Sequence, residues 1–376
     1  MTDHLTRLGA MPVTRFMRET WQRKPLLIRH AFKDFRSPVS RDALFALAQR
    51  DDVEARLVTA FNGQWRLQYG PLARLPSPRK PNWTALVQGV NLHDDAAAQL
   101  LARFRFITDA RLDDLMLSYA SAGGGVGPHV DSYDVFLLQA QGRRRWRVSR
   151  QKDLAFVAGL PLRILQDFRP TSEWVLEPGD MLYLPPGVAH EGVALDDDCI
   201  TCSIGFRAPR YRELLDPWLD ALAQRAVLPA QYTDRGLQPT NRPGRLPAAM
   251  VAATHAALSR VRPTPGDAVQ ALLTVLTEPK DEVVFDAAKP LGPTGFHRRA
   301  QRQGLALDRR SRLLYEGGWF GINGDVFRAA ADERRVLARL ADARSLPAGT
   351  LQPSGSVAER LRQWYHAGWL HFADTN

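Results

Sequence analysis

The spacing of apolar residues follows a strand-like period in the amino-terminal part of the chain and a helical period after it. In the amino-terminal part, apolar and polar positions alternate every second residue, which predicts β-strands. Segments 113–119, 133–138, 181–184 and 200–206 carry β-branched, aromatic or continuous apolar residues, and turns rich in Gly and Pro stand beside several of them. This part of the chain is therefore expected to be built on β-sheets.

Beyond Phe206 the apolar residues recur at helical spacing. Helices are expected within 211–227, 248–261 and 266–276, and the segment 229–247 is rich in Pro, Gly and polar residues, which is typical of a linker or ordered loop. Helices this short need a surface to pack on. That surface is either a second copy of the chain, in a symmetric dimer, or the sheet region of the same chain, and the pattern leaves both open.

The last segment mixes both periods. Two short strands, 312–315 and 326–327, flank a glycine-rich stretch, and amphipathic helices are expected at 333–343 and 357–367. This order resembles a winged helix. The second helix carries acidic as well as basic side chains, so it favours a module for protein contact or architecture over one that reads the major groove of DNA.

Candidate metal ligands stand at the ends of the predicted strands. In a strand, alternate residues face the same side, so His129 and Asp131 are expected to project together, and His190 follows two tight turns some sixty residues later. Two imidazoles and one carboxylate form the facial triad that holds non-heme Fe(II) with open positions. Ligands so distant in sequence meet if the sheet rolls up, as in an antiparallel jelly roll of the cupin type.

A second His-X-Asp sequence has a different interpretation. His93 and Asp95 share this spacing, but the residues at 96–101 are helix-forming. Two positions that lie two apart on a helix point in different directions. Asp94 or Asp95 is therefore predicted to cap a helix, and this motif is not expected to bind metal.

Three stretches of the chain closely resemble the bacterial ribosomal oxygenases of the JmjC class. They are FMRETWQRKPL at 16–26, GGGVGPHVDSYDVF at 123–136 and GRRRWRV at 142–148. The resemblance implies an α+β protein: a double-stranded β-helix of the cupin and JmjC type, then a helical dimerisation region, then a winged-helix-like domain. The expected domain boundaries are 1–207, 208–285 and 286–376.

The same resemblance implies an enzyme, an Fe(II)- and 2-oxoglutarate-dependent dioxygenase that hydroxylates an arginyl residue of a large-subunit ribosomal protein. His129, Asp131 and His190 would be its catalytic metal ligands, and dioxygen its second cosubstrate. We expect a homodimer that works in the cytoplasm on a ribosomal protein.

An arginine is expected to hold the far carboxylate of 2-oxoglutarate. Alternation on the strand after Gly142 groups Arg144 with Trp146 and places Arg143, Arg145 and Arg147 on the opposite face. The planar guanidinium can bind a carboxylate through two hydrogen bonds, and the resemblance assigns this role to Arg144. The alternative is that all four arginines form a solvated edge.

The resemblance also implies a second anchoring hydroxyl for 2-oxoglutarate, on the strand before the metal motif. The aligned residue is Ala120, and Ser118 and Ser121 stand beside it. The identity of the second anchor is therefore open.

Substrate-binding residues are predicted by the same alternation. Asp114 and Met116 share one strand face, and Tyr133 is expected to share a face with the metal ligands; a carboxylate beside an apolar thioether suits a guanidinium and its methylene stem. Ser203 is a further candidate where the family's pocket is lined. Alternatively, Asp114 caps a helix or strand end and Met116 fills the core.

Composition narrows the setting. The chain has 376 residues, a formal net charge of +10, and arginine-rich stretches at 297–302 and 309–312. These suggest acidic neighbours, yet we expect a solvated basic surface more than direct nucleic-acid binding. Neither a signal peptide nor a membrane-spanning apolar run is recognised. Cys199 and Cys202 are expected on opposite sides of a strand, as ordinary thiols.

Two other functions remain open at this point. One is a cupin metalloenzyme that oxidises a small molecule without 2-oxoglutarate, and the other is a non-catalytic binding protein with a winged-helix tail. An inward-pointing Arg144 would favour the 2-oxoglutarate enzyme over the first of these.

Overall fold

The computed structural model describes residues 4–61, 63–351 and 355–373, and the chain divides into two compact units. The first unit contains the residues up to Ala208 together with Lys280–Phe285; the second contains Pro209–Pro279 and the residues from Asp286 on. The first predicted boundary, after residue 207, lies next to Ala208. The division of the remainder into a helical and a winged-helix domain stays a prediction.

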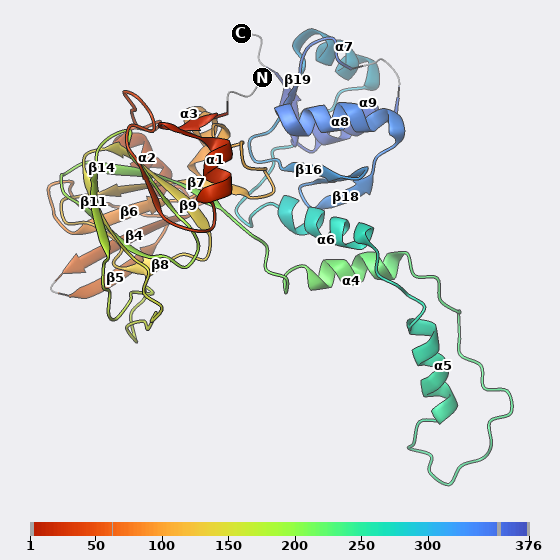
Figure 1. Ribbon diagram of the computed structural model, residues 1–376. Coiled ribbons are helices and arrows are strands. Elements are labelled where there is room, and N and C mark those ends of the chain that lie inside the picture. The colour runs from red at the N-terminus through yellow and green to blue at the C-terminus, as the bar shows by residue number, and fades with distance from the viewer. Residues whose placement is uncertain (1–3, 62, 352–354, 374–376) are drawn as a thin grey trace. The chain divides into compact units, whose positions relative to one another are not determined.

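Two antiparallel sheets face each other in the first unit (Figure 1). The large sheet contains, in spatial order, β3 (Leu26–Ile28), β12 (Met181–Leu184), β9 (Asp134–Gln141), β14 (Cys199–Phe206), β7 (Leu112–Ala120), β6 (Trp83–Val87), β4 (Ala55–Phe61) and β5 (Gln64–Tyr69). The small sheet contains β11 (Ser172–Leu176), β10 (Arg144–Ser149), β13 (Ala189–Ala194) and β8 (His129–Val130).

Apolar side chains from both sheets pack together between them. This inner cluster joins Leu137 and Leu184 of the large sheet to Trp146 and Val148 of the small sheet. Because each sheet presents alternate residues to the interior, the sandwich interior can hold both a core and a polar site. The strands predicted from 113–119, 181–184 and 200–206 are all present, as β7, β12 and β14.

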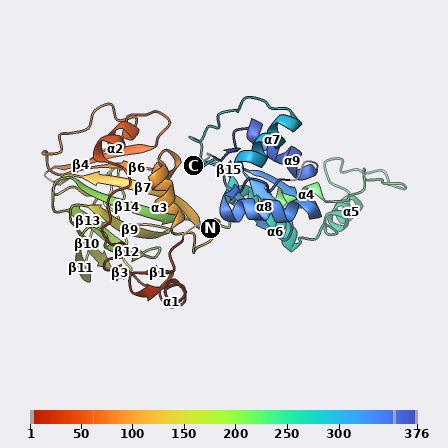
Figure 2. The same ribbon diagram turned by 90° about the horizontal axis from the view of Figure 1, so that it is seen from above.

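Helices cover the outer face of the large sheet (Figure 2). The elements on this side are β1 (Arg7–Leu8), β2 (Met11–Pro12), α1 (Val13–Glu19), α2 (Arg41–Ala48), the 3-10 turn η1 (Val90–Leu92) and α3 (Asp95–Ala102). Leu115, Leu117 and Tyr119 of β7 enter the core beneath these helices, so the alternate residues of β7 face the sandwich interior. As predicted, Asp94 caps a helix: its carboxylate accepts a hydrogen bond of 2.8 Å from the Ala97 amide.

The expected common strand face of Tyr133 and the metal ligands is not present, because the metal motif is not continuous with the strand at 133–138. His129 and Val130 form β8, which pairs with β13 in the small sheet, whereas β9 begins at Asp134 in the large sheet. The chain crosses from one sheet to the other between them. Strand alternation therefore does not run from Asp131 to Tyr133, although Tyr133 reaches the same cavity by another route.

The second unit contains the predicted helices and short strands. Its helices are α4 (Leu215–Gln224), α5 (Ala248–Leu258), α6 (Pro265–Thr277), α7 (Pro293–Gln303), α8 (Ala331–Ala343) and α9 (Ser356–His366). Its strands are β15 (Leu305–Leu307), β16 (Leu313–Glu316), β17 (Trp319–Ile322), β18 (Asp325–Arg328), β19 (Ser345–Leu346) and β20 (Leu370–Phe372). In the described part of the chain, no helix has the length and apolarity needed to cross a bilayer.

One helix of this unit was not predicted. The arginine-rich stretch 297–302 belongs to α7, which buries Phe296 and Ala300 in the core of the unit. Two buried apolar side chains in a basic segment give a weak helical period, which explains why the sequence pattern favours a solvated surface here.

Candidate metal centre and active site

Three candidate ligands converge at one point of the sandwich interior. His129 on β8 and His190 on β13 are Cα partners in the sheet register. Asp131 follows β8, and its carboxylate oxygens lie 3.8 Å from Nε2 of His129 and 3.6 Å from Nε2 of His190. Two donors that each lie about 2.0–2.2 Å from one ion can be up to about 4.4 Å apart, so the carboxylate can share an ion with either imidazole.

The outer nitrogens of both imidazoles are already engaged. Nδ1 of His129 lies 2.9 Å from the carbonyl oxygen of Gly127, and Nδ1 of His190 lies 2.9 Å from that of Val188. A carbonyl oxygen only accepts, so each Nδ1 carries the proton and each Nε2 presents its lone pair toward Asp131. The site is thereby set in the tautomer that a metal requires.

Burial supports the same protonation state. It lowers the pKa of His190 to about 4, and the neighbouring His129 imidazole acts in the same direction. His190 is therefore neutral at physiological pH, the form in which an imidazole binds metal. Within the described residues, these three side chains form the one cluster of His, Cys, Asp and Glu able to hold an ion.

Arg144 lies on β10 and points into the interior, as the alternation predicted. Its side chain is 4% exposed and packs over the ring of Trp146 at 5.7 Å. Among the described residues, its Nε and Nη2 have no hydrogen-bond partner. A buried guanidinium without partners is costly, so this geometry suits an anionic ligand.

The neighbouring arginines behave differently. Nη2 of Arg143 donates to Asp196 at 2.9 Å, and Arg147 forms an ion pair with Glu191. These two arginines thus have acidic partners of their own and do not line the cavity. The solvated-edge interpretation does not hold for Arg144.

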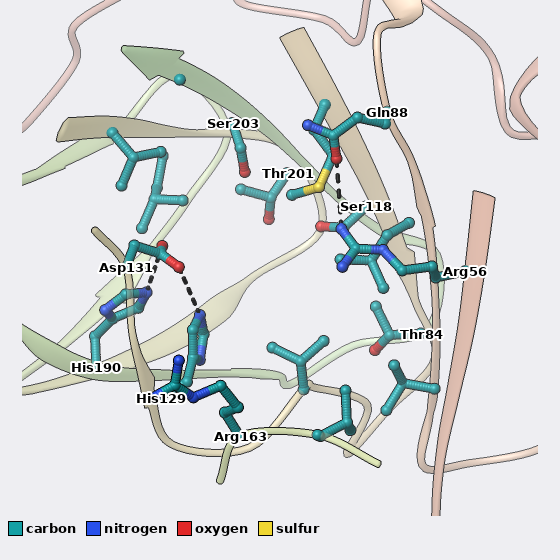
Figure 3. A pocket seen from close by; sticks show the side chains of 18 of the residues that line it. Arg56, Thr84, Gln88, Ser118, His129, Asp131, Arg163, His190, Thr201 and Ser203 are labelled. Carbon is teal, nitrogen blue, oxygen red and sulfur yellow. Dashed lines mark hydrogen bonds and ion pairs between the residues drawn. The ribbon is translucent and has the colours of Figure 1, made fainter. Parts of the chain in front are cut away.

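A cavity of about 400 Å³ contains the candidate ligands (Figure 3). The triad lies at one side of it, and Thr84, Ser118 and Arg56 lie at the other. All the site residues named from the sequence line this cavity: Asp114, Met116, His129, Asp131, Tyr133, Arg144, His190 and Ser203. Residues that sequence reasoning missed also line it: Arg56, Thr84, Gln88, Arg163 and Thr201.

Asp114 stands within β7 and has several partners. Its Oδ2 accepts hydrogen bonds from Gln88 Nε2 at 2.8 Å and from the Gly89 amide at 3.1 Å, and it forms an ion pair with Lys280 Nζ at 3.2 Å. Gly89 immediately precedes η1, so this bond ties the start of that turn to β7. All three donors use Oδ2, which leaves Oδ1 for a further donor.

Tyr133 contributes a neutral hydroxyl to the cavity. Its surroundings desolvate the phenol, and the carboxylates of Asp131 and Asp114 add to this effect, so the pKa of Tyr133 lies well above its usual value. The phenol remains protonated at physiological pH and can donate a hydrogen bond. Met116 and Ser203 are Cα partners across β7 and β14, so their side chains face the cavity as neighbours.

The two cysteines are ordinary buried thiols, as predicted. Cys199 packs with Ala120 and Ala194, whereas Cys202 lies in the core under the helices, on the other side of β14. They therefore do not form a joint redox or metal site.

Comparisons with known proteins match both units. A family model of the JmjC domain matches residues 99–214, and a model of the ROXA-like winged helix matches residues 260–371. The first match covers the strands that carry the His-Asp-His triad, so the sandwich is similar to JmjC domains. The second match confirms the winged-helix prediction and begins within the segment that was predicted as a helical region.

Individual relatives narrow the class. The ribosomal protein uL16 3-hydroxylase of Escherichia coli K12 is 40% identical over 229 residues, which is 61% of this chain and 61% of that protein. The probable ribosomal oxygenase of Haemophilus influenzae is 40% identical over 206 residues, or 51% of its length. These alignments thus span less than two thirds of each curated relative.

Solved structures match over the whole length. The X-ray structure of E. coli YcfD shares 31% identity and a TM-score of 0.84, over 98% of this chain and 100% of that chain. YcfD in complex with cobalt and 2-oxoglutarate shares 31% identity and a TM-score of 0.80, over 97% and 99%. The chain therefore belongs to the JmjC ribosomal oxygenase family.

Proposed function

We propose that this chain is an Fe(II)- and 2-oxoglutarate-dependent hydroxylase of a large-subunit ribosomal protein, and that its target is an arginyl residue. The observation that carries the proposal is a single cavity that contains a preoriented His-Asp-His triad and a buried arginine whose Nε and Nη2 have no hydrogen-bond partner among the described residues. The relatives named as ribosomal oxygenases, and a YcfD complex with cobalt and 2-oxoglutarate, support the same metal and cosubstrate.

The triad would hold Fe(II) through Nε2 of His129, Nε2 of His190 and the carboxylate of Asp131. Three protein ligands leave coordination positions for small molecules. When bound, the iron supplies the redox chemistry that couples oxidative decarboxylation of 2-oxoglutarate to the hydroxylation of a C–H bond. The residues around it orient the reactants and exclude water.

Arg144 would bind the distal carboxylate of 2-oxoglutarate. The dicarboxylate would bring the charge that the buried guanidinium lacks among the described residues, and the fork of Arg144 suits two parallel hydrogen bonds. This feature also separates the proposal from a cupin enzyme that acts on a small molecule without 2-oxoglutarate. Such an enzyme has no need of a buried cation opposite its metal.

Asp114, Met116, Tyr133 and Ser203 would form the slot for the substrate arginine. Oδ1 of Asp114 can accept from the guanidinium, Met116 offers an apolar surface for the methylene stem, and the Tyr133 and Ser203 hydroxyls can donate to a peptide carbonyl. A slot that fixes the side chain would determine which carbon lies near the metal.

Quaternary structure and location belong to the same proposal. Helix α5 buries none of its side chains within the described chain, and it exposes Val251 and Leu258. We propose that this helix packs in a homodimer, as the resemblance suggests, and that the enzyme works in the cytoplasm, where ribosomes assemble. The winged helix would serve protein contacts, and direct nucleic-acid binding is not part of the proposed activity.

The test is a mass measurement. The purified chain, Fe(II), 2-oxoglutarate and dioxygen are incubated with a panel of ribosomal proteins, and intact and digested products are analysed. We expect one added oxygen on an arginine of a large-subunit protein, with stoichiometric succinate. Loss of a methyl group, or succinate release without oxygen on any ribosomal protein, would overturn the proposal.

A further inference from the structure

Several buried polar groups that line the cavity lack a hydrogen-bond partner among the described residues, and two of them lie on different sheets. One is the Arg144 guanidinium on β10; the other is Oγ1 of Thr84 on β6, a residue that is 0% exposed. Most buried hydroxyls in folded proteins find a hydrogen-bond partner, and an exception inside a cavity indicates a ligand. Thr84 interrupts a strand that is otherwise entirely apolar.

The strand register links the two groups around one end of the cavity. Thr84 is the Cα partner of Ala120 on β7, and Ala194 on β13 is the Cα partner of Arg144. Ala120 and Ala194 pack in one cluster between them. Opposed residues of an antiparallel pair point to the same face, so Thr84 and Arg144 flank a place where both intervening side chains are methyl groups. Thr84 and Arg144 themselves line the cavity, where an anion could reach both.

Other hydroxyls near this place are already committed or belong to another row. Ser121 accepts a hydrogen bond of 3.3 Å from the Trp83 amide, and Thr201 donates to Oε1 of Gln139 at 3.0 Å. Ser118 lies one row further along β7, opposite Thr201. Four residues are Cα partners in succession across neighbouring strands of the large sheet: Val58, Thr84, Ala120 and Cys199. Thr84 is the one among them that carries a hydroxyl.

We propose that the Thr84 hydroxyl donates a hydrogen bond to the distal carboxylate of 2-oxoglutarate while Arg144 forms the ion pair with it. This inference rests on the proposed function. Ala120 has no donor, so the hydroxyl comes from the neighbouring strand. The carboxylate would then accept from one donor on each sheet and link the two sheets.

The experiment compares Thr84→Val with Thr84→Ser in the full chain. Calorimetry measures 2-oxoglutarate binding to protein loaded with Co(II) in place of Fe(II). Valine keeps the shape and removes the donor, so we expect affinity to fall about tenfold or more, the usual effect of losing a hydrogen bond to a charged group. Serine should restore most of it, and Co(II) affinity should not change.

A second ligand locates the effect. 2-Oxobutyrate has the 2-oxo acid group but no distal carboxylate, so Thr84→Val should bind it as wild type does. Thr59→Val, a substitution on β4 of the same sheet but outside the cavity lining, should leave both affinities unchanged. If valine disrupts folding, judged by circular dichroism, Thr84→Ala takes its place.

The outcomes separate this inference from the proposed function. Wild-type affinity for 2-oxoglutarate in the valine or alanine variant would overturn the role of Thr84 and leave the enzyme's function intact. Equal losses for 2-oxoglutarate and 2-oxobutyrate would also overturn it, since they indicate a distorted cavity. Absence of 2-oxoglutarate binding to the wild-type protein would instead overturn the proposed function itself.

Discussion

Two buried carboxylates of the second unit have charged partners, whereas one buried guanidinium of the first unit does not. In the second unit, the Glu333 carboxylate accepts from the Ala330 amide and pairs with Arg360, and Asp267 pairs with Arg225 and caps α6 through Thr264. In the first unit, the buried guanidinium of Arg144 has no acidic partner among the described residues.

This contrast is not a general property of the first unit. Away from the cavity, the buried Asp134 carboxylate accepts from Tyr183 at 2.6 Å, from Arg111 at 3.0 Å and from Gln22 at 2.9 Å. A buried charge with a full set of partners holds the fold together, whereas one without partners in a cavity is available to a ligand. The difference teaches which buried charges can be removed without unfolding the protein.

The largest effect is expected from the metal ligands. His190→Ala removes one of three ligands, so turnover should fall more than about 1,000-fold, or about 4 kcal/mol at 1.4 kcal/mol per tenfold, because no other described residue can replace it. Succinate release and Co(II) absorption measure the loss. The control is chelation of the wild type, which should abolish activity until Fe(II) is restored. Retention of wild-type turnover by the variant would contradict the assignment.

Replacement of Arg144 tests the comparison directly. In Arg144→Met, the affinity for 2-oxoglutarate should fall about 100-fold, or about 2.7 kcal/mol, while the free energy of unfolding stays constant or rises, since a lone buried charge gives way to an apolar chain. Calorimetry and urea unfolding measure the two effects. Arg143→Met, whose arginine pairs with Asp196 at the surface, should leave 2-oxoglutarate affinity unchanged. A large fall in the free energy of unfolding of Arg144→Met would show that Arg144 stabilises the fold, as the paired buried charges do.

The converse substitution lies in the second unit. Glu333→Gln should lower the free energy of unfolding by about 2 kcal/mol, since it removes the charge from a buried pair whose arginine is partly exposed, and should not change 2-oxoglutarate affinity. Urea unfolding provides the measurement. Glu359→Gln, which removes an exposed ion pair with Arg362, should have little effect. A change in cosubstrate affinity would contradict the structural role of Glu333.

The effect of Glu333 should depend on pH with a defined sign. Burial opposes its ionisation, but the Ala330 amide and Arg360 outweigh burial and lower the pKa of the carboxyl. A lowered pKa stabilises the fold above the ordinary glutamate pKa, and this contribution disappears as the pH falls through the folded value. The gap between wild type and Glu333→Gln should therefore narrow on acidification.

Local sequence predicted those features that a single strand determines. Alternation in β10 placed Arg144 inside, and alternation in β7 placed Asp114 and Met116 on the cavity face. It failed between Asp131 and Tyr133, because a chain that leaves one sheet for the other carries no local sign of the crossing. Thr84 could not be found from the sequence, because its meaning depends on the register of β6 against β7. The sequence does show a lone hydroxyl residue in an apolar segment, but it does not show which face of the strand that residue occupies or what lies beside it.

The smallest expected effect concerns Lys280. Like the role of Thr84, the role of Lys280 follows from a contact between residues that are distant in sequence. Its ammonium lies 3.2 Å from Asp114 and 3.7 Å from Asp113, and its side chain is 37% exposed. If Asp114 receives the substrate guanidinium, a cation already beside it opposes binding. Lys280→Gln should then lower the KM for a basic ribosomal peptide about threefold at low salt, with kcat unchanged and less effect at high salt.

Steady-state kinetics at two ionic strengths measure this change, and Lys289→Gln, at an exposed lysine, serves as the control for net charge. An equal fall in KM for both variants would show that overall charge, not the slot, governs peptide binding. A rise in KM for Lys280→Gln alone would show that the lysine holds Asp114 in its binding position. The Lys280 ammonium would then have a structural role, like the paired charges of the second unit and unlike Arg144.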